Sequence, residues 1–199
     1  MNLYTIALFF HVNGAIGYFV GISTWLFILV GLWRAQRVEQ VRALVNLIGL
    51  SGPFSGISVL LLLASGFYMA FTAWSLQTGW ILVSLISLVL MVSLGAALIE
   101  PHRRAIDRLA REAPDGPLPE SLGQRIHDPI LSTALETVAV LLLGIVFLMT
   151  TKPALPGSLI VMAVALVLGM ASGLFISGAT RALWQREAAH TNGESARVG

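Results

Sequence analysis

Residues 4–33 read YTIALFFHVNGAIGYFVGISTWLFILVGLW, and this stretch determines what kind of protein the chain forms. It carries no formal charge and a single ionisable side chain, His11. At about 1.5 Å of rise per residue, a helix of this length exceeds the roughly 30 Å hydrocarbon core of a bilayer. The sequence therefore predicts a membrane-spanning helix that holds a histidine inside the membrane.

The composition of the whole chain agrees with this interpretation. Of its 199 residues, 56% are apolar and 11% are charged, and the mean hydropathy is +0.83. Soluble domains carry about 25% charged residues, and the strand-period alternation of a membrane barrel is missing here. We therefore expect an all-α, polytopic transmembrane helical bundle. The chain has no cysteine, which excludes disulfides, thiolate metal sites and cysteine nucleophiles.

Four further apolar segments follow the first. The sequence predicts five spans within a bundle of residues 1–184, at about 4–33, 54–74, 80–99, 130–151 and 158–179. Ser51-Gly52-Pro53 predicts a kink before the second span, with residues 44–50 at the membrane interface, because proline removes a helix donor. Asp128-Pro129 is typical of a helix start, since Asp can cap free N–H groups and Pro lacks one.

Two segments outside the spans are polar. In the cytoplasmic loop of residues 100–128, Ile106 and Leu109 fall on one helical face, and Asp107 and Arg111 form an i,i+4 pair on another. This pattern predicts an amphipathic helix lying on the bilayer surface. Residues 185–199 are polar and rich in small residues, so we expect a disordered cytoplasmic tail.

The distribution of positive charge predicts the orientation in the membrane. The arginines all follow the first, third and fifth spans, namely Arg34, Arg37, Arg42, Arg103, Arg104, Arg108, Arg111, Arg125, Arg181, Arg186 and Arg197. The only lysine, Lys152, follows the fourth span. The positive-inside rule then places the N-terminus outside and the C-terminus in the cytoplasm. We expect a multi-pass protein of the bacterial inner (plasma) membrane, with the lipid bilayer as its main partner.

His11 is the first candidate site residue. It shares a helical face with small residues and aromatic rings: Gly14, Ala15, Tyr18, Gly21 and Trp25. Small residues let a helix or a flat cofactor approach the backbone, and an imidazole in hydrocarbon needs a partner. Three roles stay open: a hydrogen bond to a hydroxyl on another helix, an axial bond to haem b or a transition metal, and proton relay. The cofactor-binding candidates are His11, Tyr18 and Met69.

Glu136, in the fourth span, is the second ionisable residue inside the membrane. It is expected to be protonated, hydrated, paired with Arg34 or Arg42, or close enough to the interface to reach the headgroups. A route from it to His11 would need water or the hydroxyls of Ser84, Ser87 and Ser93.

Metal binding is the weaker prospect. Met69, Met149 and Tyr68 lie at roughly the depth of His11, and a histidine with one or two methionines suits Cu(I). Methionines scattered over several spans more often fill gaps in a core. His102 and His127 in the cytoplasmic loop have no third ligand at a suitable spacing, so no metal site is predicted.

The segments YTIALFFHVNGAIGYFV, SGPFSG, LLLASGFYMAFTAW and IVFLMTTKP together resemble a bacterial family of predicted integral membrane proteins of unknown function. The similarity covers about residues 3–173. That family is distantly similar to the CopD-type superfamily, which includes copper-resistance proteins and the HemJ-type protoporphyrinogen oxidase. The resemblance implies haem b binding at His11. It does not carry over the oxidase activity, because the oxidase pattern needs a lysine inside a middle span.

We expect a non-enzymatic accessory or assembly component whose small-residue faces pack against other helices, a second copy or another membrane protein. The alternative is a haem b-binding or quinone-linked redox protein that uses His11 as an axial ligand. Metal or ion permeation through His11 and Glu136 is the third hypothesis. The positive-inside rule accounts for the positions of the basic residues, so nucleic acid is not expected as a partner.

Overall fold

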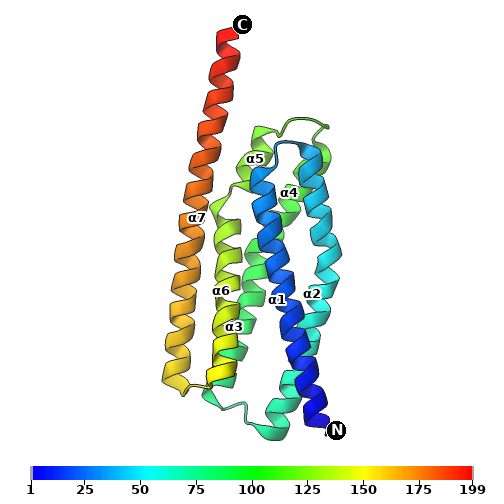
Figure 1. Cartoon of the computed structure of the whole chain (residues 1–199), viewed down its shortest axis with the longest axis vertical. Helices are drawn as coiled ribbons and strands as arrows, with labels where there is room; N and C mark the ends of the chain where they lie inside the picture. The colour runs from blue at the N-terminus through cyan, green and yellow to red at the C-terminus, as the bar shows by residue number, and fades with distance from the viewer. Residues whose placement is uncertain (1, 199) are drawn as a thin grey trace.

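The computed structural model describes the backbone of residues 2–198 and the side chains up to residue 185. The predicted disordered tail, residues 185–199, thus falls almost wholly outside the described side chains. The described chain is an elongated bundle of helices (Figure 1): α1 (Leu3–Arg34), α2 (Val38–Ala73), α3 (Gly79–Leu94), the π-helix η1 (Gly95–Ile99), α4 (Glu100–Glu112), α5 (Glu120–Ile126), α6 (Pro129–Thr151) and α7 (Leu155–Val198).

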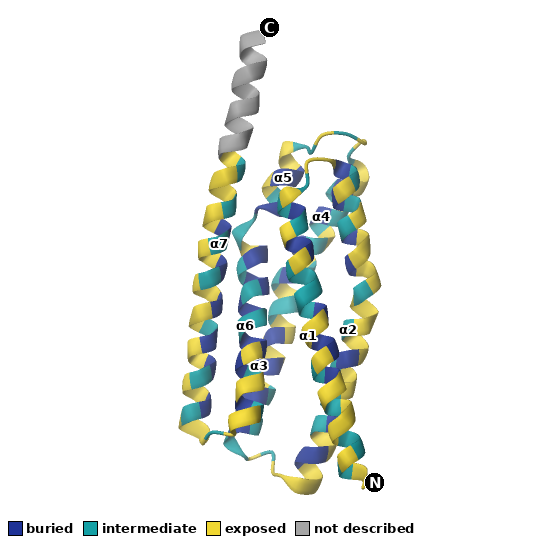
Figure 2. Cartoon of the chain, viewed as in Figure 1, coloured by how far each residue is buried: buried dark blue, intermediate teal, exposed yellow. Residues whose placement is uncertain are grey.

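The predicted all-α membrane architecture is confirmed. Five helical segments are long and apolar enough to cross a bilayer: Leu3–Trp33, Val38–Ala73, Gly79–Glu112, Glu120–Thr151 and Leu155–Gln185. Exposed residues cover the outer faces of these helices, and buried residues line the inner faces (Figure 2). Many of the exposed side chains are large and apolar, such as Phe27 and Phe175. Such a surface is stable against lipid tails and not against water.

Helices α1 and α2 form one tightly packed hairpin. A Cβ atom built at Gly14 would lie 2.8 Å from the backbone nitrogen of Leu62 and 2.8 Å from the carbonyl oxygen of Ser58. Gly17 likewise faces the Ser58 side chain, and Gly21 faces Ser55. Only glycine fits at these contacts, because the facing atoms belong to the α2 backbone or to serines bonded to it. The small-residue face of the first span is therefore filled from within the chain.

Helices α6 and α7 form a second hairpin in the same way. A Cβ at Gly173 would lie 2.5 Å from the Cα of Thr133, and one at Gly169 would lie 2.7 Å from the Cα of Thr137. Close contact of this kind replaces the hydrophobic drive that is missing between helices in lipid. Helix α3 packs against this second hairpin, in contact with α6 and α7, and α1 contacts α6. The small residues of the fifth span, like those of the first, contact a neighbour in the same chain.

Helix α2 runs through the segment in which the sequence predicts a kink. It begins at Val38, and Pro53 lies inside it, so the segment of residues 44–50 belongs to the same helix as the predicted span 54–74. Proline removes one backbone hydrogen bond in a helix, and nearby serines supply others. Ser51 Oγ donates to the Ile48 carbonyl (3.0 Å) and Ser55 Oγ to the Ser51 carbonyl (3.2 Å). Polar groups in lipid are satisfied inside the helix in this way.

Helix α4, which the sequence predicts to lie on the bilayer surface, packs on another helix of the bundle. It continues α3 through the π-turn η1, where the Glu100 N–H bonds to the Gly95 carbonyl five residues earlier. Pro101 follows at once and cannot donate the next regular bond, which accounts for the widened turn. The predicted apolar face of α4 is real, but it packs on α2: Ile106 and Ala110 are each 1% exposed. The predicted pair forms as well, with Arg111 Nε 2.8 Å from Asp107 Oδ1.

Gly14→Ala is expected to lower the free energy of unfolding in detergent by about 1–3 kcal/mol. The added methyl group would clash with backbone atoms of α2, which cannot move away without separating the two helices. Gly56→Ala on α2 is the matched control, since no atom lies within 4 Å of a Cβ built there. That control should leave the melting temperature unchanged or raise it, as alanine favours a helix over glycine. Thermal unfolding followed by circular dichroism makes the comparison. Equal effects of the two changes would contradict the packing described.

Candidate functional site

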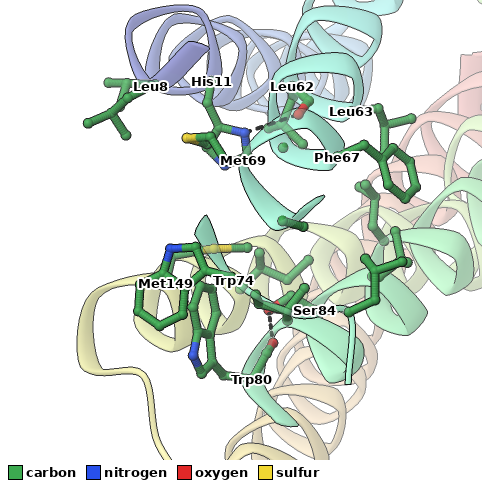
Figure 3. A pocket seen from close by; sticks show the side chains of 18 of the residues that line it. Leu8, His11, Leu62, Leu63, Phe67, Met69, Trp74, Trp80, Ser84 and Met149 are labelled. Atoms are coloured by element: carbon green, nitrogen blue, oxygen red, sulfur yellow. Dashed lines mark hydrogen bonds between the residues drawn. The ribbon is translucent and has the colours of Figure 1, made fainter. Parts of the chain in front are cut away.

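A cavity of the described bundle lies at the end that carries the N-terminus. It has a volume of about 340 Å³, within the range of about 300–1,000 Å³ found for small-molecule sites. Its walls come from α1, α2, α3 and α6, and most lining side chains are apolar. In Figure 3, His11 and Met69 lie on one side of the cavity, and Met149, Trp74, Trp80 and Ser84 lie on the other.

His11 has a defined hydrogen bond in this wall. Its Nδ1 lies 3.0 Å from the carbonyl oxygen of Leu62 on α2 (Figure 3), and the Ser65 hydroxyl lies 3.5 Å from the same nitrogen. A carbonyl can only accept, so Nδ1 carries the proton and the neutral ring has an unprotonated Nε2. Nε2 has no hydrogen-bond partner among the side chains and backbone groups described. The main partner of the histidine is therefore a backbone carbonyl, whereas the sequence suggested a hydroxyl.

Gly66 makes room for this imidazole. A Cβ at Gly66 would lie 3.0 Å from His11 Cε1 and 3.2 Å from Nδ1. Both distances are tighter than almost all real Cβ contacts, so the ring rests on bare backbone one turn after Leu62. The histidine is thus held in place by a bond on one nitrogen and by the α2 backbone beneath its edge. Its orientation follows from the α1–α2 packing.

The three cofactor-binding candidates from the sequence line this one cavity. Tyr18 and Met69 are each 9% exposed, and they join His11 in the wall. Met149, from α6, is a further lining residue. Tyr68, which the sequence placed at the same depth, instead lines a more open groove of about 280 Å³ between α1 and α2. The structure thus brings the two methionines to the side of the histidine's cavity and separates Tyr68 from them.

Sequence reasoning missed the polar edge of the cavity. Lys152 caps α6 in the left-handed conformation (φ 50°, ψ 52°), and its Nζ lies 4.7 Å from the ring centre of Trp74 and 5.9 Å from that of Trp80. The two indoles contact each other edge to face at 5.3 Å. Gly79 holds the turns together, because a Cβ there would meet the Leu155 backbone at 2.8 Å. Span parity alone places both turns at the same end of the bundle, and this was the signal available.

Glu136 lies apart from the cavity. It is half-buried on α6 and faces α7, where its Cβ would lie 3.3 Å from a Cβ at Gly173. No hydrogen bond or ion pair to Glu136 is found among the described residues. Arg42, one of its predicted partners, instead bonds to Asp115 and to the Ala110 carbonyl (2.7 Å). The carboxyl group is therefore not part of an ion pair with Arg42.

The serines of α3 do not connect Glu136 to His11. Each donates to the backbone carbonyl four residues earlier: Ser84 to Trp80 at 2.7 Å, Ser87 to Val83 at 2.8 Å and Ser93 to Val89 at 2.9 Å. A hydroxyl that is bonded within its own helix has no donor left for a relay. The predicted route through these three side chains is not formed in this structure.

The two loop histidines lie at the opposite end of the bundle. His102 Nδ1 faces the Leu98 carbonyl at 2.7 Å, and its Nε2 lies 3.2 Å from Asp128 Oδ2. Asp128 also caps α6 as predicted, by accepting from the Ile130 N–H at 2.9 Å. His127 stacks on Trp184 of α7, with ring centres 5.1 Å apart. Both imidazoles thus connect residues 100–128 to the ends of α6 and α7. Within the described residues, no group of three metal-ligating side chains is found.

Comparison with known proteins identifies the family. The sequence model of a family described as predicted integral membrane proteins, DUF2269, matches residues 5–153. The chain belongs to this family. The match confirms the expected membership of an integral membrane family of unknown function, although it ends before α7 and so falls short of residue 173. Every residue that lines the cavity except Tyr4 lies inside the match. Neither the curated proteins nor the solved structures contain a match.

Glu136→Gln is expected to leave the melting temperature unchanged or to raise it, because an unpartnered carboxylate in the span is replaced by a neutral group. The matched control is Glu100→Gln. Glu100 bonds to Arg103 at 2.7 and 2.6 Å and to Arg104 at 2.7 Å. Its neutral variant should therefore have a free energy of unfolding that is lower by about 1 kcal/mol. Thermal unfolding in detergent checks both. A larger loss from Glu136→Gln than from Glu100→Gln would show that Glu136 has a stabilising partner.

Proposed function

We propose that this member of the DUF2269 family is a non-enzymatic, haem b-binding component of the bacterial inner membrane, with His11 as an axial ligand. The observation that carries the proposal is the hydrogen bond from His11 Nδ1 to the Leu62 carbonyl, 3.0 Å long, in the wall of an apolar cavity. A metal-binding histidine typically donates its other N–H to a carbonyl or carboxylate, which fixes the tautomer and the ring orientation.

The other lining groups fit the same cofactor. Met149 lies across the cavity from His11 in Figure 3, and its thioether would be available as a second protein ligand to the haem iron. Tyr18 and Met69 are buried side chains that would pack against the porphyrin. Haem b, when bound, supplies one-electron redox chemistry. The resemblance to HemJ-type proteins is in keeping with this role and rests in this chain on His11.

A quinone fits the histidine less well. Quinone oxygens accept hydrogen bonds, and the one N–H of neutral His11 already donates to Leu62. The free Nε2 can accept a bond or coordinate a metal ion. We therefore favour iron as the partner of this nitrogen over the quinone that the sequence left open.

The other two hypotheses lose their supporting features. An accessory role was expected because the small-residue faces of α1 and α7 could bind another chain, but those faces contact α2 and α6. Permeation was expected through His11 and Glu136, but the intervening serines bond within their own helix. The haem proposal keeps its supporting feature, which is the Nε2 of His11 in the cavity wall.

Protein expressed with ample haem should show a Soret band, and His11→Gly should lose most of it because the axial nitrogen is gone. Added imidazole should restore the band in this variant, because a free ring can occupy the space of the deleted one. Absorption spectra of oxidised and dithionite-reduced protein in detergent measure both effects.

Tyr68→Phe is the control for that experiment, since Tyr68 lies at the same depth but lines the other groove. It should keep the spectrum of the unaltered protein. A featureless spectrum from haem-replete protein, or an unchanged Soret band in His11→Gly, would overturn the proposal.

We also propose that the cavity opens toward the outer side of the inner membrane. The arginines of the described chain lie at the α4–α5 end or at the ends of spans that reach it, and Lys152 lies at the cavity end.

Because the chain has no native cysteine, single substitutions report on sidedness directly. Gln77→Cys, in the exposed turn between α2 and α3, should react with a membrane-impermeant maleimide in intact cells. Glu112→Cys, at the exposed end of α4, should react only after the membrane is made permeable. The reverse pattern would invert the proposed orientation.

A further inference from the structure

Lys152 is a cation without a carboxylate partner. No ion pair to it occurs among the described residues, and none of the side chains that line the cavity is acidic. The nearest acidic residue before it on α6 is Glu136, sixteen positions earlier and so roughly 24 Å away along the helix. Every other acidic side chain of the described chain precedes α6 and lies in the α2 start or the α4–α5 region. The positive charge at the cavity edge is thus not balanced by any acidic side chain that the structure describes.

The backbone and two rings fix where this charge lies. Lys152 is the only described non-glycine residue with a positive φ, a conformation that disfavours side chains by roughly 1–2 kcal/mol. Its Nζ lies against the faces of Trp74 and Trp80, which themselves form part of the cavity wall. A cation–π contact orients an ammonium group but does not neutralise it. The ammonium is therefore held beside the cavity with its charge available.

The cavity is consequently positively charged at its edge and apolar in its interior. Below Lys152 the walls are apolar, with side chains such as Leu63, Leu85 and Leu142. His11 lies deeper, about two helical turns from the start of α1. A ligand that satisfies both ends is amphipathic. Its apolar body enters between the helices, and its charged group stays at the membrane interface.

We propose that Lys152, Trp74 and Trp80 form a subsite for the anionic group, a carboxylate or a phosphate, of the ligand whose apolar body fills the His11 cavity. This inference rests on the proposed function, and it specifies the ligand further: haem b would bind through its propionates at this edge. The same anionic chemistry is also offered by the headgroup of a membrane lipid. The test below separates these two sources.

The first experiment compares haem with its dimethyl ester, which lacks free carboxylates, on the full chain in nanodiscs of neutral phosphatidylcholine. Soret titration should give about tenfold tighter binding for the diacid, the size expected of one charge-assisted hydrogen bond. Lys152→Gln should remove this preference, and Lys152→Arg should keep it. Arg181→Gln, which removes an exposed charge at the other end of the bundle, is the matched control and should change nothing.

Equal binding of diacid and diester by the unaltered protein would overturn the subsite, as would a preference that survives in Lys152→Gln. Repeating the titration with anionic phosphatidylglycerol in the nanodisc identifies the source. If the preference disappears, lipid phosphate occupies the subsite, and if it persists, the carboxylates of the cofactor do. Both results keep an anion at Lys152.

A second probe keeps the inference testable if haem does not bind at all. That outcome overturns the proposed function and leaves the charge at the cavity edge to be tested alone. A brominated long-chain fatty acid and its methyl ester are then compared by quenching of Trp74 and Trp80, with phenylalanine at Trp25, Trp33 and Trp184. Stronger quenching by the acid, lost in Lys152→Gln, supports the anion subsite. Equal quenching by the acid and the ester overturns it.

Discussion

Three glycines on α1 allow its backbone to lie directly against α2, and this contact determines where the groups of the cavity lie. Gly14 meets the backbone of α2 at Leu62 and Ser58, and the carbonyl of the same Leu62 accepts the hydrogen bond from His11. In lipid, helices gain little from apolar burial, so such close contact is what holds a pair together. A larger residue at Gly14 would separate the helices and remove the histidine from its partner.

The opposite wall depends on a second contact, between the turns at the N-terminal end of the bundle. Gly79 lies against Leu155, which brings Trp80 beside the end of α6 and places Lys152 over the indoles. Side chains of α1, α2, α3 and α6 thus enclose a space that neither hairpin could form alone. The far end of the bundle is closed differently, by ion pairs and by stacked rings such as His127 and Trp184. One end holds the largely apolar cavity, and the other carries most of the charged side chains that the structure describes.

The spans were predictable because lipid imposes a simple rule on helix length and charge, and the Asp128 cap was predictable because it is local. The continuity of α2 through Pro53 was not, since a proline marks a lost backbone donor but does not show whether the helix continues past it. The packing of α4 on α2 was also missed, because an amphipathic face does not say whether protein or lipid covers it. Periodicity found His11, but not its bond to a backbone carbonyl 51 positions away. Lys152 was assigned to a loop, and its contact with two tryptophans depends on how the α2–α3 and α6–α7 turns lie relative to each other.

His11 presents an unprotonated Nε2 to an apolar cavity. Nitrogen-15 NMR of histidine-labelled protein in nanodiscs tests this directly, with His11 assigned by its absence in His11→Ala. The account predicts a neutral ring protonated at Nδ1, whose unprotonated Nε2 signal shifts or disappears when haem is added. A ring protonated at Nε2, or an Nε2 signal that haem leaves unchanged, would contradict it.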